Sequence, residues 1–266
     1  MNTVMTLGTV PAGTLAGMIL SLLISIGIPL TLFILARKKL KASGIAFVIG
    51  AAVFVVFALV LESLLHSVVL TATGTLLTGN VFLYGLYGGL AAALFEETGR
   101  LVAMKFYMKK TLNRENSVMY GIGHGGIEAI LLVGLTYLSN ILTALMINSG
   151  ALEASLELMD DAAKQSTIEQ LKVLWETPSW QFYVAGAERL IAIVLQIALS
   201  VLVYKAVTAK SRKYWFLAFG IHFAVDFVTV VMTGLGAPIW VAETLLLVAV
   251  VLIARYTYSL YKEETV

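Results

Sequence analysis

Long apolar stretches, separated by short charged segments, run through the whole chain. At 1.5 Å per residue, a helix needs about 20 residues to cross the ~30 Å hydrocarbon layer of a membrane. Backbone groups inside a bilayer must bond within their own segment. We therefore expect an all-α, polytopic membrane helix bundle in one domain, with about seven transmembrane helices. The expected spans are 12–36, 44–66, 80–104, 117–147, 183–205, 214–233 and 237–257.

Charge along the chain predicts the orientation of these spans. Basic residues gather after the first, third, fifth and seventh spans, and such residues mark the cytoplasmic side of a membrane. We therefore expect the N-terminus outside and the C-terminus in the cytoplasm, in the plasma membrane of a bacterium. No basic segment precedes the first apolar run, so we expect no cleavable signal peptide. The basic groups are Arg37, Lys38, Lys39, Lys41, Lys105, Lys109, Lys110, Arg114, Lys205, Lys210, Arg212, Lys213, Arg255 and Lys262.

Composition agrees with a membrane protein and excludes several kinds of site. Hydrophobic residues make up 59% of the chain and charged residues 13%, which is unlike a soluble domain of 266 residues. Cysteine is absent, so there is no thiol nucleophile and no cysteine metal site. The motifs H-E-x-x-H and G-x-S-x-G are also absent from the sequence. We expect lipids as partners and no nucleic acid; the oligomeric state is left open.

The connection 148–182 is the longest between two expected spans. It is acidic, its apolar residues recur at helical spacing, and Pro178 ends the pattern. We interpret it as an amphipathic helix on the outer face of the bundle; a lid or a substrate-recognition element is the alternative. Its apolar positions are Leu152, Leu156, Met159, Ala163, Ile168, Leu171 and Leu174.

Three of the spans carry ionisable residues in their inner halves. Such a residue at the bilayer centre costs roughly 2.5–3.5 kcal/mol on insertion scales. Counted from the expected cytoplasmic ends, all of these residues lie between the inner surface and the midplane. A common depth predicts a shared cavity, and glycine pairs in the third and fourth spans predict that these two helices touch. The residues are Glu96, Glu97, Arg100, His124, Glu128, His222 and Asp226.

These residue types suit the activation of a buried water molecule. Each histidine has a carboxylate four residues later, which can orient its imidazole. Two imidazoles and one or two carboxylates could hold a divalent metal such as Zn²⁺. Equally, a glutamate could act as general base without a metal, while a histidine polarises the scissile carbonyl. The residues alone leave both mechanisms open.

Two other functional classes also fit a polar cavity inside a membrane. A proton- or cation-coupled transporter or channel is the main alternative to an enzyme, and a catalytically inactive scaffold is a third. A second polar set lies in the expected outer half, and we interpret it as contacts between helices. A proton path or an outward gate is the alternative for this set, which consists of Glu62, His66, Glu188, Arg189 and Glu243.

The three inner groupings resemble the motifs of the CAAX-protease and bacteriocin-processing superfamily and of PrsW-type proteases. The pattern is most similar to the YhfC family of intramembrane metalloproteases. The resemblance covers about 96–226 and implies an intramembrane peptidase, metal-dependent or glutamate-type, that hydrolyses a peptide bond in or near the membrane. Its motifs are Glu96-Glu97-x-x-Arg100, His124-x-x-x-Glu128 and His222-x-x-x-Asp226.

The resemblance also implies roles for individual residues. CAAX proteases place the arginine one residue further along, so the catalytic base is either Glu96 or Glu97. Asp226 stands where asparagine is common, which favours a metal ligand or a histidine orienter over an oxyanion donor. The implied substrate is a peptide or a membrane protein. The implied catalytic residues are Glu96, Glu97, Arg100, His124, His222 and Asp226, and the implied metal ligands are His124, Glu128, His222 and Asp226.

Overall fold

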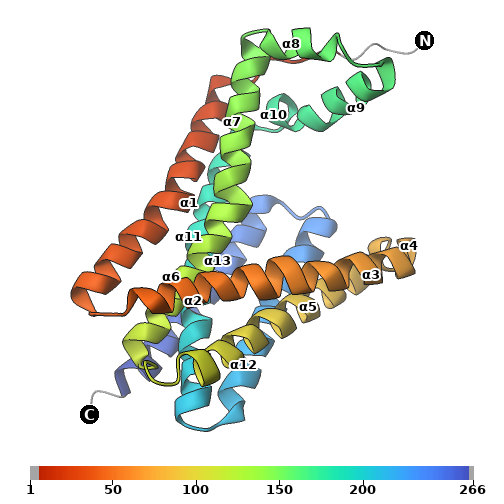
Figure 1. Cartoon of the computed structure of the whole chain (residues 1–266). Helices are drawn as coiled ribbons and strands as arrows, with labels where there is room; N and C mark the ends of the chain where they lie inside the picture. Colours follow the sequence, from red (N-terminus) through yellow and green to blue (C-terminus); the bar gives the residue numbers. More distant parts are fainter. Residues whose placement is uncertain (1–5, 264–266) are drawn as a thin grey trace. The chain divides into compact units, whose positions relative to one another are not determined.

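The computed structural model describes residues 6–263, which form helices joined by short connections (Figure 1) and contain no strand. Three of the helical segments, η1 to η3, are π-helical. In chain order the elements are α1 (Ala12–Lys39), α2 (Gly44–Val53), η1 (Phe54–Glu62), α3 (Ser63–Thr73), α4 (Thr75–Thr78), α5 (Val81–Val102), η2 (Ala103–Tyr107), α6 (Arg114–Ala129), η3 (Ile130–Gly134), α7 (Leu135–Asn148), α8 (Ala151–Leu156), α9 (Asp161–Leu171), α10 (Val173–Glu176), α11 (Ser179–Thr208), α12 (Arg212–Gly234) and α13 (Ile239–Lys262).

Six continuous helices in the described part of the chain are long and apolar enough to cross a membrane. Each overlaps an expected span, which confirms the all-helical, polytopic class. The expected third span, 80–104, is also helical, as α5, but it is not among these six helices. The count of seven and the orientation of the termini stay predictions. The six helices are Ala12–Lys39, Gly44–Thr73, Arg114–Asn148, Ser179–Thr208, Arg212–Gly234 and Ile239–Lys262.

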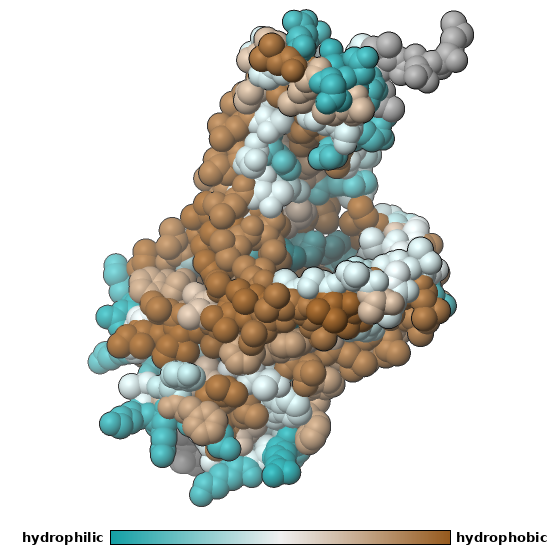
Figure 2. All heavy atoms as spheres, turned by 45° about the vertical axis from the view of Figure 1, so that its right-hand side comes forward, coloured by the Kyte–Doolittle hydropathy of each residue, from teal (hydrophilic) through white to brown (hydrophobic). Residues whose placement is uncertain are grey.

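Apolar side chains cover much of the outer surface, as lipid contact requires (Figure 2). Val48, Leu64 and Val68 on the second of these helices are 63%, 59% and 67% exposed, and Leu252 on α13 is 62% exposed. A soluble monomer rarely exposes a continuous apolar surface of this kind. The outward faces of these helices are therefore suited to contact with the acyl chains of lipids.

The chain packs as two units, each with its own core. The first unit contains Met1–Ile28 and Ala129–Leu190, and the second contains Pro29–Glu128 and Ile191–Val266. Three helices, α1, α6 and α11, pass from one unit into the other. Every residue of the three motifs lies in the second unit.

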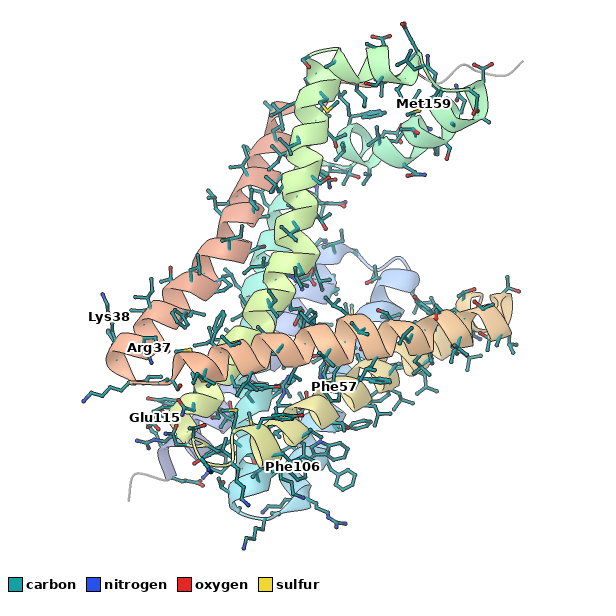
Figure 3. All side chains as sticks on the ribbon, viewed as in Figure 1. Arg37, Lys38, Phe57, Phe106, Glu115 and Met159 are labelled. Carbon is teal, nitrogen blue, oxygen red and sulfur yellow. The ribbon has the colours of Figure 1, made fainter. Side chains whose placement is uncertain are left out.

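The first unit contains the acidic connection 148–182. Its expected amphipathic helix forms as three short helices, α8, α9 and α10, because Asp160 interrupts the run and caps α9 by accepting a 2.9 Å hydrogen bond from the Ala163 amide. The apolar pattern holds at Leu156, Ile168 and Leu174, which are buried. Met159, labelled in Figure 3, is the exception, since it is 44% exposed.

The second unit is built around the close pairing of α5 and α12 (Figure 1). Glycines on α5 make the approach possible: a Cβ at Gly89 would lie 3.0 Å from the carbonyl oxygen of Phe223. The helix formed by α2, η1 and α3 also packs on α5. These contacts fix the two helices that carry the first and third motifs.

Glycines also position α6, which carries the second motif. A Cβ at Gly123 would lie 2.1 Å from the carbonyl oxygen of Phe47, and one at Gly121 would lie 2.6 Å from Cα of Ile197. The backbone of α6 therefore passes close to both α2 and α11. This brings His124 into the middle of the unit, where it is fully buried.

Candidate active site

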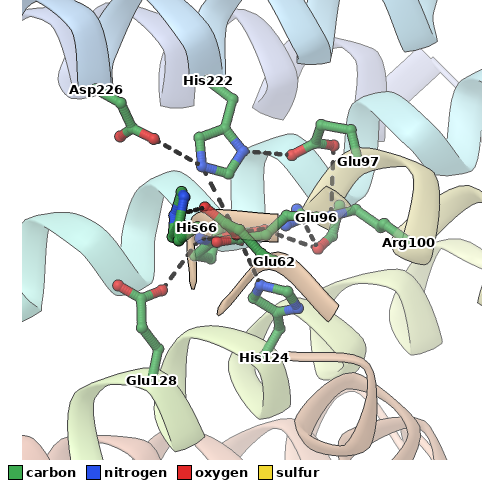
Figure 4. A network of polar contacts seen from close by, with 11 residues as sticks. Glu62, His66, Glu96, Glu97, Arg100, His124, Glu128, His222 and Asp226 are labelled. Carbon is green, nitrogen blue, oxygen red and sulfur yellow. Dashed lines mark hydrogen bonds and ion pairs between the residues drawn. The ribbon is translucent and has the colours of Figure 1, made fainter. Parts of the chain in front are cut away.

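Polar side chains from α5, α6, α11 and α12 meet in the second unit (Figure 4). Glu96 is 7% exposed, His222 4% and His124 not at all. The expectation that the third and fourth spans touch is met at this point, because Glu96 of α5 bonds to His124 of α6. The three motifs, separated in sequence by up to 125 positions, thus form one network.

Glu96 is the centre of this network. Its Oε2 accepts hydrogen bonds from His124 Nε2 at 2.8 Å and from Gln196 Nε2 at 3.1 Å. Nε2 of His222 lies 3.9 Å from the same oxygen. Both imidazoles therefore direct their Nε2 atoms to a single carboxylate oxygen.

Glu97 has different partners from its neighbour. It is fully buried, its Oε1 lies 2.8 Å from His222 Nδ1, and its Oε2 lies 3.5 Å from Nε of Arg100. Helical geometry places Arg100 about 40° from Glu96 and about 60° from Glu97, and a long side chain reaches either. The arginine pairs with Glu97 because Glu96 is turned toward His124. Its charge thus stabilises the carboxylate that holds His222.

Gln196 of α11 joins the two sides of the network. The sequence patterns did not predict it as a site residue. Arg100 donates to the Gln196 side-chain oxygen, to its backbone oxygen at 2.9 Å and to Ser200 Oγ at 3.1 Å. Because the amide oxygen faces Arg100, the amide nitrogen faces carboxylates, and it donates to Glu96 and Glu128 at 3.1 Å each. The available signal was a glutamine four residues before a serine inside an apolar helix.

Glu128 and Asp226 form the more accessible edge of the site. The side chain of Asp226 is 33% exposed, against 9% for Glu96, and its Oδ2 lies 3.5 Å from His222 Nε2. The expected orientation of His124 by Glu128 is wrong: Glu128 accepts from Gln196, and His124 Nδ1 has no hydrogen-bond partner among the described residues. Spacing of four residues permits such a pair without requiring it.

Glu62 is drawn with the residues of this network in Figure 4. It is 8% exposed at the end of η1. His66 lies 3.1 Å from Glu62 and 2.8 Å from the Tyr87 hydroxyl.

The other expected outer residues are divided between the two units. Glu188 and Arg189 are adjacent in the first unit and bond to each other. Glu243 is on α13 in the second unit. The interpretation of these residues as contacts between helices stays a prediction.

The donor types fit a divalent cation. Nitrogen from two histidines and oxygen from a glutamate are the ligands of His₂Glu zinc sites. Within residues 6–263, no three of these side chains are already arranged as a complete metal shell. Among the contacts described for residues 6–263, five carboxylates and one arginine, Arg100, lie in this network. The carboxylates concerned are Glu62, Glu96, Glu97, Glu128 and Asp226.

Comparisons with known proteins point to the same family as the motifs. Residues 20–247 match the family model described as YhfC intramembrane metalloprotease. The chain is 39% identical over 196 residues to the "Uncharacterized membrane protein YhfC" of Bacillus subtilis (strain 168), covering 73% of this chain and 74% of that protein. No solved structure matches the chain. With its apolar helices, it is a multi-pass integral membrane protein. The chain belongs to the YhfC intramembrane metalloprotease family.

Proposed function

We propose that this protein is an intramembrane peptidase that hydrolyses a peptide bond in or near the membrane with a water molecule activated by Glu96. One observation carries the proposal: Nε2 atoms of His124 and His222 both face Glu96 Oε2, at 2.8 and 3.9 Å. A carboxylate beside two imidazoles in a buried site can take a proton from water while a second group stabilises the scissile carbonyl.

Glu96 is a better candidate for the base than Glu97. Glu97 is fully buried between Arg100 and His222, and its backbone oxygen accepts a 3.0 Å hydrogen bond from the Trp215 indole. These contacts favour a positioning role for Glu97, which holds Arg100 and His222 in place. Glu96 has no arginine at ion-pair distance among the described residues, so its charge remains available for proton transfer.

Glu97 also selects the working nitrogen of His222. A carboxylate bonded to Nδ1 keeps the proton on that nitrogen, which leaves the Nε2 lone pair directed to Glu96 and Asp226. The distances of 2.8 Å to Glu97 and 3.5 Å to Asp226 fit this assignment. His222 is thereby prepared to bind a cation or to polarise a carbonyl.

The excess of carboxylates supports a divalent metal in this reaction. His124 and His222 would hold it, and Asp226 and Glu128 would complete the shell from the accessible edge. When bound, a divalent metal polarises the carbonyl and favours ionisation of water. Gln196 keeps Glu96 and Glu128 in place through its amide nitrogen.

Product mapping in cells tests the proposal. The wild-type chain and Glu96→Gln are expressed separately in a strain that lacks the gene, and new peptide termini in membrane proteins are mapped by mass spectrometry. The matched control is Glu169→Gln, which removes an exposed carboxylate from α9 of the first unit. We expect new termini with the wild type and control and none with Glu96→Gln.

Ion transport is the competing function, and one observation favours it. Glu62, His66 and Tyr87 form a chain of hydrogen bonds that could carry protons. Purified protein in liposomes loaded with a pH-sensitive dye measures this directly. Proton flux that is lost in Glu96→Gln, together with identical peptide termini in all strains, would replace the peptidase with a transporter.

A further inference from the structure

The second unit has a pocket outside the network of Figure 4. It lies between the C-terminal ends of α5 and α11 and the start of α12, and its volume is about 660 Å³. This is within the range of ligand-binding pockets, roughly 300–1,000 Å³. Lys105, Lys210 and Arg212 line it from three different elements, beside Trp215 and Phe216.

The charge of this pocket has no compensation from the protein. No carboxylate lines it in the part of the chain that the structure describes, and none of its three cations forms an ion pair there. Lys105 instead lies over the Phe106 ring, 5.4 Å from its centre. Three converging cations without an acid create a positive potential that attracts an anion.

Topology explains why cations occur at this end of the unit but not why they line a pocket. The positive-inside rule only requires basic residues near the cytoplasmic ends of spans. Lys38 satisfies it from the exposed end of α1, outside the pocket (Figure 3). The arrangement of Lys105, Lys210 and Arg212 around one space is an additional feature.

The rest of the lining selects the kind of anion. Leu101, Val207 and Phe216 give the pocket an apolar wall next to its cations. Phe216 is 61% exposed, which leaves room for a hydrocarbon chain to leave the pocket along it. Basic pockets between transmembrane helices on the cytoplasmic side bind anionic lipid headgroups. We propose that this pocket binds the phosphate of an anionic phospholipid from the cytoplasmic leaflet.

One hydrogen bond joins the pocket to the motif helix. Trp215 lines the pocket, and its indole N–H donates to the backbone oxygen of Glu97 at 3.0 Å. Thr98, the next residue, also lines the pocket. A headgroup bound here therefore braces the part of α5 that carries the glutamate pair. The lipid site itself does not depend on the proposed peptidase activity.

Lipid titration tests the proposal on the full chain in a zwitterionic detergent. Dioctanoyl-phosphatidylglycerol is the probe, dioctanoyl-phosphatidylcholine is the zwitterionic comparison, and bound lipid is counted by native mass spectrometry. The variant is Lys105→Gln/Lys210→Asn/Arg212→Gln. Asparagine is used because Lys210 has φ of +50°, a conformation that asparagine tolerates. Each cation near an anionic headgroup contributes about fivefold in affinity, so the triple variant should bind about 100-fold more weakly.

A second triple variant removes the same charge elsewhere. Lys38→Gln/Lys39→Gln/Lys109→Gln changes exposed cations outside the pocket and should bind phosphatidylglycerol within about threefold of wild type. If the triple variant does not fold, the single variant Lys105→Gln still tests the proposal, because it should bind the lipid about fivefold more weakly than wild type. Equal losses in both triple variants, or equal binding of phosphatidylcholine, would overturn the proposal. Inorganic phosphate that competes at the same concentration as the lipid would make this a phosphate site instead.

Discussion

Two ion pairs with the same spacing behave as opposites in this molecule. Glu97 and Arg100 on α5 of the second unit are three residues apart, 3.5 Å from each other and fully buried. Glu169 and Lys172 in the first unit are also three residues apart and closer, at 2.7 Å, but their side chains are 57% and 27% exposed. Water stabilises each charge of the exposed pair, whereas the buried pair depends on protein groups. Burial, and not distance, decides which pair the fold requires.

Removing the cation of each pair gives the largest contrast. Arg100→Met leaves Glu97 as a buried charge without its partner and also frees acceptors on Gln196 and Ser200. Breaking a buried pair in this way costs about 3–5 kcal/mol. Lys172→Met should lower the unfolding midpoint only slightly, because Glu169 stays in water. Denaturant unfolding of both variants in matched micelles, followed by circular dichroism, measures the difference.

The contrast fails if both variants unfold at the same denaturant concentration. Such a result would show that water or a bound ion compensates Glu97 in the absence of Arg100. A double variant, Glu97→Gln/Arg100→Met, separates these cases: it should recover part of the lost stability, because no uncompensated charge remains.

For the buried region, the sequence predicts the positions of the helices better than it predicts which side chains are in contact. Hydropathy alone locates the spans, and counting depth brings Glu96, His124 and His222 to one level, where the structure joins them. It does not choose between Glu96 and Glu97 as the partner of Arg100. Their angular separations from the arginine differ by only about 20°, which side-chain rotamers cover.

Other contacts lack any periodic signal. Gln196 is one of two glutamines in α11, and its four contacts to Arg100, Glu96 and Glu128 depend on how this helix packs. Glu62 is the last residue of a π-helical segment that the hydrophobic pattern does not reveal. Whether His124 meets Glu128 or Glu96 is likewise decided by packing between helices, which one sequence does not specify.

Metal binding provides the next contrast between the units. His124 and His222 are the imidazoles of the proposed metal site, so His124→Ala/His222→Ala should lose its divalent metal. The matched change in the first unit is Asp161→Ala/Glu169→Ala, which removes two acids from α9. Inductively coupled plasma mass spectrometry of purified protein should find about one zinc-type ion per chain in wild type and in the α9 variant. A metal-free wild type that still cleaves peptides would favour glutamate chemistry over a metal.

Gln196 gives a smaller effect that tests positioning. Gln196→Leu removes the donor to Glu96 and Glu128 and the acceptor for Arg100. Groups that orient metal ligands typically change metal affinity or activity by 10–100-fold, and we expect a loss of metal affinity in this range. Gln170→Leu on exposed α9 is the same substitution in the first unit and should have no effect. Competition with a fluorescent zinc chelator measures both affinities, and equal affinities would remove Gln196 from the site.

The smallest predicted effect concerns the exposed pair and its pH dependence. The hydrogen bond that Lys172 donates to Glu169 raises the pKa of Lys172 above its ordinary value. A raised lysine pKa contributes stability that is fully present below the unfolded value, near 10.4, and is lost as the pH rises through the folded pKa. The stability difference between wild type and Lys172→Met should therefore stay constant from pH 6 to about 9 and shrink only in stronger base. Denaturant midpoints across this range measure it. A difference that changes between pH 6 and 8 would mean that a group other than Lys172 couples the first unit to pH.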